Sequence, residues 1–175
     1  GREMMSIDLP GAFLHTMNDE EIFMLLQGPL AELMVLVSPK LYRPYVTYDA
    51  KGVPLMYVRM NKAMYGLLKS ALLFYRKLVA DLEGVGFKLN PYDPCVANRD
   101  VNGSQQTVVF HVDDLHCSHI DPAVNTELAL YLSDKYGDGI AVHRGDVHDY
   151  LGMDFDYSDR DKRTVKVSQI KYLHN

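Results

Sequence analysis

The sequence has no tryptophan and only two cysteines, Cys95 and Cys117, which do not form a CxxC pair. Two widely separated thiols provide neither a disulfide framework nor the ligand spacing of a structural zinc site. We therefore expect both cysteines to be buried free thiols.

Long apolar runs are also missing. No stretch approaches the roughly 20 apolar residues of a membrane span, and the N-terminal stretch GREMMSIDLPGAF lacks the basic, apolar and small-residue regions of a signal peptide. The chain has no repeats, low-complexity tracts or linkers. These absences predict a soluble, intracellular protein without a membrane partner, and 175 residues are enough for one ordinary domain.

Positive charge is scarce overall but concentrated in one segment. The net charge of −5 argues against a polyanionic partner. Residues 40–88, however, hold nine Lys or Arg against three acidic residues, a net of +6 that leaves −11 for the remainder. This asymmetry favours contact with a nucleic acid, although each cation taken alone fits a solvated helix face equally well.

Hydrophobic periodicity and turn residues predict the order of the elements. Leu67 to Glu83 repeats apolar residues at three and four positions, and Asp121 with Pro122 begins a second helix that ends at Tyr136. A shorter helix is expected over 31–37. Strands are expected over 4–9, 21–26, 54–61, 95–99, 106–112 and 115–120, with a last hairpin from 150–158 and 164–169. This order predicts an α+β fold, one mostly antiparallel sheet with helices on one face.

Two adjacent aspartates interrupt the stretch VVFHVDDLHCSH, residues 108–119. Successive side chains point to opposite faces of a strand, so both carboxylates can serve one site only where the backbone turns. Asp113 and Asp114 are therefore expected at the tip of a hairpin, either as an ordinary turn or as part of a metal site. Asp8 ends an apolar strand just before Pro10-Gly11 and is the candidate for a third carboxylate. Three neighbouring carboxylates repel unless a cation lies among them, and hard oxygen ligands favour Mg²⁺.

Five pieces in order give the chain a resemblance to a known family. They are SIDLPGAFLHTMNDEEIFM, NKAMYGLLKSALLFYRKL, GFKLNPYDPCV, VVFHVDDLHCSH and YLGMDF. Together they resemble the reverse transcriptase of Ty1/copia-type retrotransposons over most of the chain. The resemblance implies a polymerase palm over residues 1–175 that catalyses nucleotidyl transfer with two Mg²⁺ ions, or with Mn²⁺ in their place.

The same resemblance implies roles for individual residues. Asp8, Asp113 and Asp114 would be the catalytic metal ligands. The nucleotide-binding residues would be Leu9, Phe13, Tyr65 and Gly66, with Phe13 excluding the sugar 2′-hydroxyl. Template and primer would contact Lys69, Arg76, Leu151, Gly152 and Met153. Phe13 and Tyr65 would equally suit a core, and Lys69 and Arg76 would equally suit a solvated surface.

The implied partners are an RNA template, a DNA primer and deoxynucleoside triphosphates, in the cytoplasm or in a virus-like particle. The sequence departs from the family where His111 replaces the usual Tyr and where YGLLKSAL replaces YGLKQSPR. We expect the fingers and ribonuclease H regions of a larger polyprotein to be missing. Two alternatives stay open: an inactive relic that acts at most as a nucleic-acid or protein binding module, and another two-metal nucleotidyl-transfer or cyclase enzyme. His111, His116 and His119 are interpreted as ordinary strand histidines rather than zinc ligands.

Overall fold

The computed structural model describes residues 1–170. Its centre is a six-stranded sheet, here called the main sheet, in which every neighbouring pair is antiparallel. The strands, in spatial order, are β5 (Lys88–Leu89), β6 (Val96–Val101), β7 (Ser104–His111), β8 (Asp114–His119), β1 (Glu3–Asp8) and β9 (Ala141–Arg144). The long hairpin β6–β7 turns at Asn102-Gly103, where both residues have positive φ, as the Asn-Gly pair predicts.

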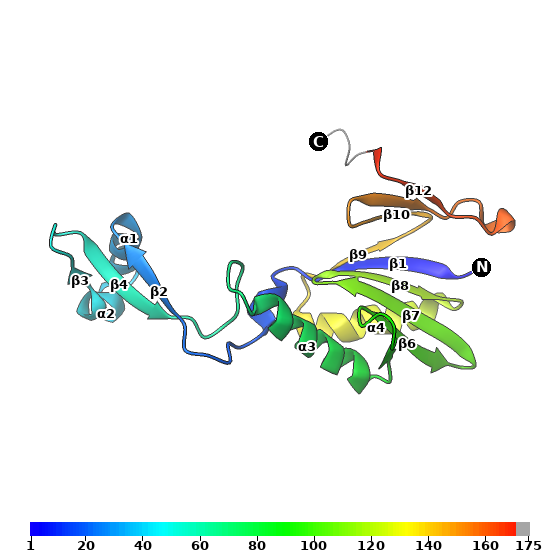
Figure 1. Cartoon of the computed structure of the whole chain (residues 1–175), viewed down its shortest axis with the longest axis horizontal. Coiled ribbons are helices and arrows are strands. Elements are labelled where there is room, and N and C mark those ends of the chain that lie inside the picture. The colour runs from blue at the N-terminus through cyan, green and yellow to red at the C-terminus, as the bar shows by residue number, and fades with distance from the viewer. Residues whose placement is uncertain (171–175) are drawn as a thin grey trace.

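Two helices cover one face of the main sheet, α3 (Ser70–Gly84) and α4 (Pro122–Tyr136), and both run alongside its strands in Figure 1. Alternate strand residues point toward them and are buried, among them Met5 and Ile7 of β1 and Leu115 and Cys117 of β8. The helices contribute to the same apolar core the side chains of Phe74, Leu78, Leu82, Leu128 and Leu132. The expected α+β class, an antiparallel sheet with helices on one face, is confirmed.

Local signals explain where these helices begin. The Asp121 side chain accepts a hydrogen bond from the Ala123 backbone N–H at 2.9 Å, and α4 spans the residues that the sequence predicts. Helix α3 begins three residues later than expected. Leu67 N–H donates to the Met64 carbonyl and Ser70 Oγ donates to the same oxygen, so the residues before Ser70 form turns instead of a helical first turn.

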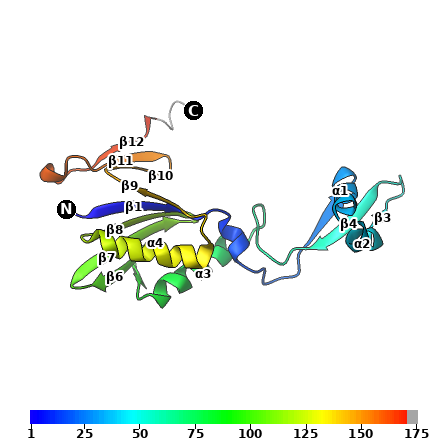
Figure 2. The same ribbon diagram turned by 180° about the vertical axis from the view of Figure 1, so that it is seen from behind.

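A separate lobe, residues 23–59, extends from the main body (Figures 1 and 2). It contains β2 (Phe23–Gln27), α1 (Pro29–Val37), α2 (Pro39–Tyr42), the 3-10 turn Arg43–Tyr45, β3 (Thr47–Tyr48) and β4 (Pro54–Arg59). Its three strands form their own antiparallel sheet in the order β2-β4-β3. The strands expected over 21–26 and 54–61 therefore exist, but they pair with each other outside the main sheet.

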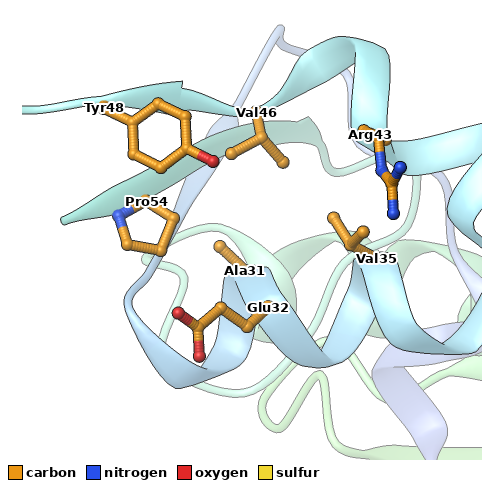
Figure 3. A pocket seen from close by; sticks show the side chains of 7 residues that line it. All are labelled: Ala31, Glu32, Val35, Arg43, Val46, Tyr48 and Pro54. Atoms are coloured by element: carbon orange, nitrogen blue, oxygen red, sulfur yellow. The ribbon is translucent and has the colours of Figure 1, made fainter. Parts of the chain in front are cut away.

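The two segments that connect the lobe to the body are fastened to each other. Met17 and Lys62 form an isolated antiparallel bridge, and the Asn18 side-chain amide donates to the carbonyls of Met60 and Lys62 at 2.7 and 3.0 Å. Within the lobe, a cavity of about 490 Å³ lies between α1 and the β3–β4 strands (Figure 3). Its lining is apolar or aromatic apart from Glu32 and Arg43.

A third sheet, here called the C-terminal sheet, lies on the side of the main sheet opposite the helices (Figure 1). It consists of β10 (Val147–Tyr150), β11 (Met153–Asp156) and β12 (Lys166–Ser168), with a 3-10 turn at Arg160–Lys162. The expected last hairpin corresponds to the β11–β12 pair. Strand β10 was not expected, and it pairs with β11 through the Leu151-Gly152 turn.

The structure differs from the sequence expectation at one cysteine. Cys117 is fully buried in the core, and burial raises the pKa of its thiol to about 12. Cys95 is only half-buried, because it lies at the start of β6 beside the Asp93-Pro94 turn. Within residues 1–170, no helix is long and apolar enough to cross a membrane.

Candidate active site

Asp8 and Asp114 lie directly opposite each other in the main sheet. Asp8 is the last residue of β1 and Asp114 the first of β8, and the register of this antiparallel pair places their Cα atoms as partners. Residues directly opposite in such a pair have side chains on the same face. Since Ile7 and Leu115 face the helices, both carboxylates belong to the opposite face of the sheet.

Asp113 joins them through a two-residue turn between β7 and β8. His111 pairs with Asp114, which leaves Val112 and Asp113 as the loop of the hairpin. The Asp113 carbonyl accepts a hydrogen bond from the Leu9 backbone N–H at 3.0 Å, so the chain just after Asp8 is held against the turn. The backbones of the three candidate metal ligands thus meet where β1 ends and β8 begins, as the sequence predicts.

The charges of these carboxylates act on one another. Burial raises the pKa of the Asp114 carboxyl, and the negative charges of Asp113 and Asp8 raise it further. His111 opposes this by lowering the Asp114 pKa, whereas Asp149 of β10 adds to the increase. A cation among the carboxylates would remove this repulsion and favour the charged form of each.

Tyr65 and Phe13 lie beside Asp113. The Tyr65 hydroxyl donates to Asp113 Oδ2 at 3.4 Å, and the Asp113 charge raises the pKa of the Tyr65 phenol, so the hydroxyl keeps the proton that it donates. The Phe13 ring packs on the Tyr65 ring with centroids 4.6 Å apart, and on the Phe74 ring of α3 at 6.3 Å. Phe13 is buried whereas Tyr65 is exposed, so Phe13 supports a tyrosine that faces solvent next to the aspartates.

The remaining candidates are placed as follows. The Leu9 side chain is fully buried, so only its backbone is available to a ligand. Gly66 has a φ of +94°, which a residue with a side chain rarely adopts, and a Cβ there would meet open space. Lys69 is ion-paired with Glu20 and, at 3.8 Å, with Asp19, whereas Arg76 is exposed on α3.

The β10–β11 hairpin approaches the aspartates from above the sheet. A cavity of about 190 Å³ lies between it and strands β1, β8 and β9, lined by Asp8, Asp114, His143, Asp149 and Tyr150 among others. Leu151 and Gly152 form the turn of this hairpin, with φ values of +54° and +73°, and Met153 begins β11.

Asp149, Tyr150 and His143 were not predicted as site residues. Asp114 raises the pKa of Tyr150, after the larger effect of burial, to a total of about 12. Tyr150 belongs to the YLGM stretch, so the sequence contained a signal for it. His143 lies in β9, a strand that the hydrophobic pattern does not indicate.

The donor set suits a hard cation, but the side chains are not gathered around one point. Within residues 1–170, no group of three or more His, Cys, Asp or Glu side chains is positioned to hold a metal ion. The backbone brings Asp8, Asp113 and Asp114 to one edge, and ion binding would require their carboxylates to rotate toward each other.

Comparisons with known proteins identify the fold. No protein-family model and no curated protein sequence matches the chain. A solved structure of apo telomerase from Candida tropicalis, truncated from its C-terminal domain, matches with a TM-score of 0.51 and 10% identity over 95% of this chain. The chain shares its fold with part of a telomerase.

Two further telomerase structures also match. They are telomerase from Candida albicans in complex with a fragment of telomeric RNA, with a TM-score of 0.47, and another apo telomerase from Candida tropicalis, with a TM-score of 0.45. Each is 12% identical, and they cover 96% and 94% of this chain. The chain spans about a third of the length of these structures, 35%, 32% and 32% in turn.

Proposed function

We propose that this chain is the palm of an RNA-directed DNA polymerase of the Ty1/copia type, and that Asp8, Asp113 and Asp114 are its catalytic carboxylates. The observation that carries the proposal is the register of β1 and β8, which sets Asp8 opposite Asp114 beside the Val112-Asp113 turn. These residues are more than 100 positions apart in the sequence, and an ordinary turn would not require an aspartate on the neighbouring strand.

The chemistry fits magnesium or manganese. When bound, Mg²⁺ would supply the Lewis acid that lowers the pKa of an attacking hydroxyl and stabilises a departing pyrophosphate. The carboxylates of this chain would hold the cation. Burial raises the pKa of Asp114 most, and the cation would relieve the additional repulsion from Asp113 and Asp8.

Other residues would position the substrates. Phe13 packs on Tyr65, which contacts Asp113, and this aromatic pair would suit the sugar of an incoming deoxynucleotide. Tyr150 of β10 lines the same cavity as Asp114. The turn that follows it, with Leu151, Gly152 and Met153, would suit the end of a primer. An RNA template paired with that primer would be held through backbone phosphates, which do not require a specific sequence.

The test is a Mn²⁺ titration of the parent chain and of Asp113→Asn. We expect the substitution to weaken binding at least about tenfold, because it removes an anionic ligand. Asp100→Asn is the matched control, since Asp100 lies at the β6–β7 turn, at the opposite end of β7 from Asp113, where it accepts the Gly103 N–H at 3.0 Å. Equal affinities for all three proteins would contradict the proposal.

Primer extension separates an enzyme from a relic. Extension of a DNA primer on an RNA template with Mg²⁺ and deoxynucleotides, abolished by Asp114→Asn, would support the polymerase. Ion binding that is lost in Asp113→Asn, combined with no extension by the polyprotein from which the chain derives, would support the inactive binding module instead.

A further inference from the structure

The C-terminal sheet is attached to the main sheet by polar groups. Within residues 1–170, the apolar core contains no residue of β10, β11 or β12. One attachment is the 2.8 Å contact between His143 Nε2 of β9 and the Val147 carbonyl oxygen of β10. A second is made by Ser6 of β1, His116 of β8, His148 of β10 and Tyr157, which follows β11; we call these four residues the joint. His148 is fully buried and His116 is half-buried, so their polar atoms need partners within the protein.

Four hydrogen bonds run through the joint in sequence. Tyr157 OH lies 3.2 Å from His116 Nε2, and His116 Nδ1 lies 3.2 Å from Ser6 Oγ. Ser6 Oγ in turn lies 2.8 Å from His148 Nδ1, and His148 Nε2 lies 3.1 Å from the Gly145 carbonyl oxygen.

With neutral imidazoles, the final acceptor determines the direction of every hydrogen bond in the joint. A carbonyl oxygen can only accept, so His148 carries a proton on Nε2. When this imidazole is neutral, its Nδ1 accepts from the Ser6 hydroxyl. Ser6 has then used its single proton, and its oxygen accepts from His116 Nδ1–H. His116 Nε2 is left to accept from the Tyr157 hydroxyl. A neutral His116 agrees with the burial that lowers its pKa to about 4.

The joint lies immediately behind the candidate carboxylates. Ser6 and Asp8 are two residues apart on β1, and His116 and Asp114 are two apart on β8, so all four share the face opposite the helices. Ser6, Asp8 and Asp114 line the same cavity as Asp149 and Tyr150 of β10. The His116 ring also packs against the rings of His148, Tyr150 and Phe155, with centroids 5.1, 5.5 and 6.0 Å away.

We propose that Ser6 is a positioning residue, and that the joint fixes the β10–β11 hairpin at its distance from Asp8 and Asp114. No residue of the apolar core lies in this hairpin, so the joint acts together with the ring contacts of His116 and the His143 contact to the Val147 carbonyl oxygen. That the hairpin positions a primer end rests on the proposed function, whereas the joint itself does not.

The decisive variant is Ser6→Ala. It removes the hydroxyl that His116 Nδ1 and His148 Nδ1 both contact, so each of these rings loses one hydrogen-bond partner. We expect amide hydrogens of β10 and β11 to exchange roughly tenfold to a hundredfold faster, with no change in α4. Ser6→Thr, which keeps the hydroxyl, should restore protection. The control is Ser118→Ala, because Ser118 is half-buried on the same face and bonds Arg2 instead of the C-terminal sheet.

A spectroscopic signature distinguishes the joint from ordinary packing. Imidazole ¹⁵N shifts at pH 8 should show His116 protonated on Nδ1 and His148 protonated on Nε2. The opposite tautomers would contradict the hydrogen bonds proposed for the joint. Shifts and exchange rates in Ser6→Ala equal to those of the parent would contradict the role of Ser6 in holding the hairpin.

The positioning role has its own readout. In the polyprotein, Ser6→Ala should raise the KM for a primer with a recessed 3′ end at least about tenfold more than Ser118→Ala does, and Ser6→Thr should lie near the parent. A loosened hairpin with an unchanged KM would overturn positioning and leave the polymerase proposal standing. If the parent does not extend a primer at all, the proposed function is contradicted. The exchange rates and ¹⁵N shifts would still test whether the hydrogen bonds of the joint exist.

Discussion

At the scale of the residue, Val112 has a backbone conformation that a β-branched side chain rarely adopts. It occupies the first loop position between β7 and β8 with a φ of +53°, next to Asp113. The other tight hairpin turns have glycine at their second position, Asn102-Gly103 and Leu151-Gly152. Strain of this kind, about 1–3 kcal/mol, persists where the surroundings impose it and is concentrated at functional sites.

The first prediction compares Val112→Gly with Val112→Ala. Alanine normally gives the more stable protein because glycine has more freedom in the unfolded chain, by about 0.4–1 kcal/mol. At Val112 the Cβ of alanine keeps a penalty of about 1–2 kcal/mol that glycine lacks. Both variants lose the same packing of Val112 against the core. We therefore expect Val112→Gly to be the more stable by about 0.5–1 kcal/mol in urea unfolding.

Val101 is the control for this comparison, since it is half-buried at the end of β6 and has no positive φ. At Val101 the alanine variant should therefore be more stable than the glycine variant. An alanine variant more stable than the glycine variant at both positions would show that the turn stores no strain.

At the scale of the element, local signals determined how much of the fold could be predicted. Helix α4 was predicted over its full length because a cap, a proline and a periodic apolar face all lie within its own residues. Strands β5, β9 and β10 were missed because they have two to four residues each, and β9 is exposed throughout. Such strands exist through pairing with neighbours, which no local pattern encodes.

In the candidate site, too, only the residues with local sequence signals could be predicted. The aspartates could be predicted because Asp113 and Asp114 interrupt a strand pattern and fall in order with the other family motifs. The joint could not, since Ser6 contacts His116 and His148 across 110 and 142 positions. In the sequence these histidines only alternate with apolar neighbours, as strand histidines generally do.

The second prediction concerns the basic segment around α3. Lys69 is already paired with Asp19 and Glu20, and the hydrogen bond with Glu20 raises the pKa of its ammonium group, whereas Arg76 has no ion pair within the described part of the chain. A cation that is neutralised internally releases few counterions on binding a polyanion. We expect Arg76→Ala to reduce the salt slope for an RNA–DNA hybrid by about 1, and Lys69→Ala to change it little.

Fluorescence anisotropy at several salt concentrations would measure both slopes. Lys88→Ala serves as the control, because Lys88 is an exposed cation at the far end of the main sheet. Equal slopes for Arg76→Ala and Lys88→Ala would show that Arg76 faces solvent in the complex.

At the scale of the whole molecule, the lobe exposes an apolar sheet face. Met56 of β4 is buried against the side of α1, whereas Phe23, Leu25 and Tyr57 are on the other face and are 58%, 43% and 63% exposed. Leu25 and Tyr57 are direct cross-strand partners, and Phe23 is two residues from Leu25, so the three form one patch. Contiguous apolar patches on a protein surface favour association.

The third prediction is that the patch drives self-association of this chain. Replacing Phe23, Leu25 and Tyr57 together by threonine should lower the apparent mass in concentration-dependent ultracentrifugation, because threonine keeps the strand propensity while removing apolar area. The control replaces Leu68, Tyr92 and Leu130 by polar residues, threonine or glutamine. These three side chains are as exposed as the patch or more so, but they are scattered over the body. If both triple variants associate as the parent does, the association surface lies elsewhere. If only the control does, the lobe is where a second chain packs.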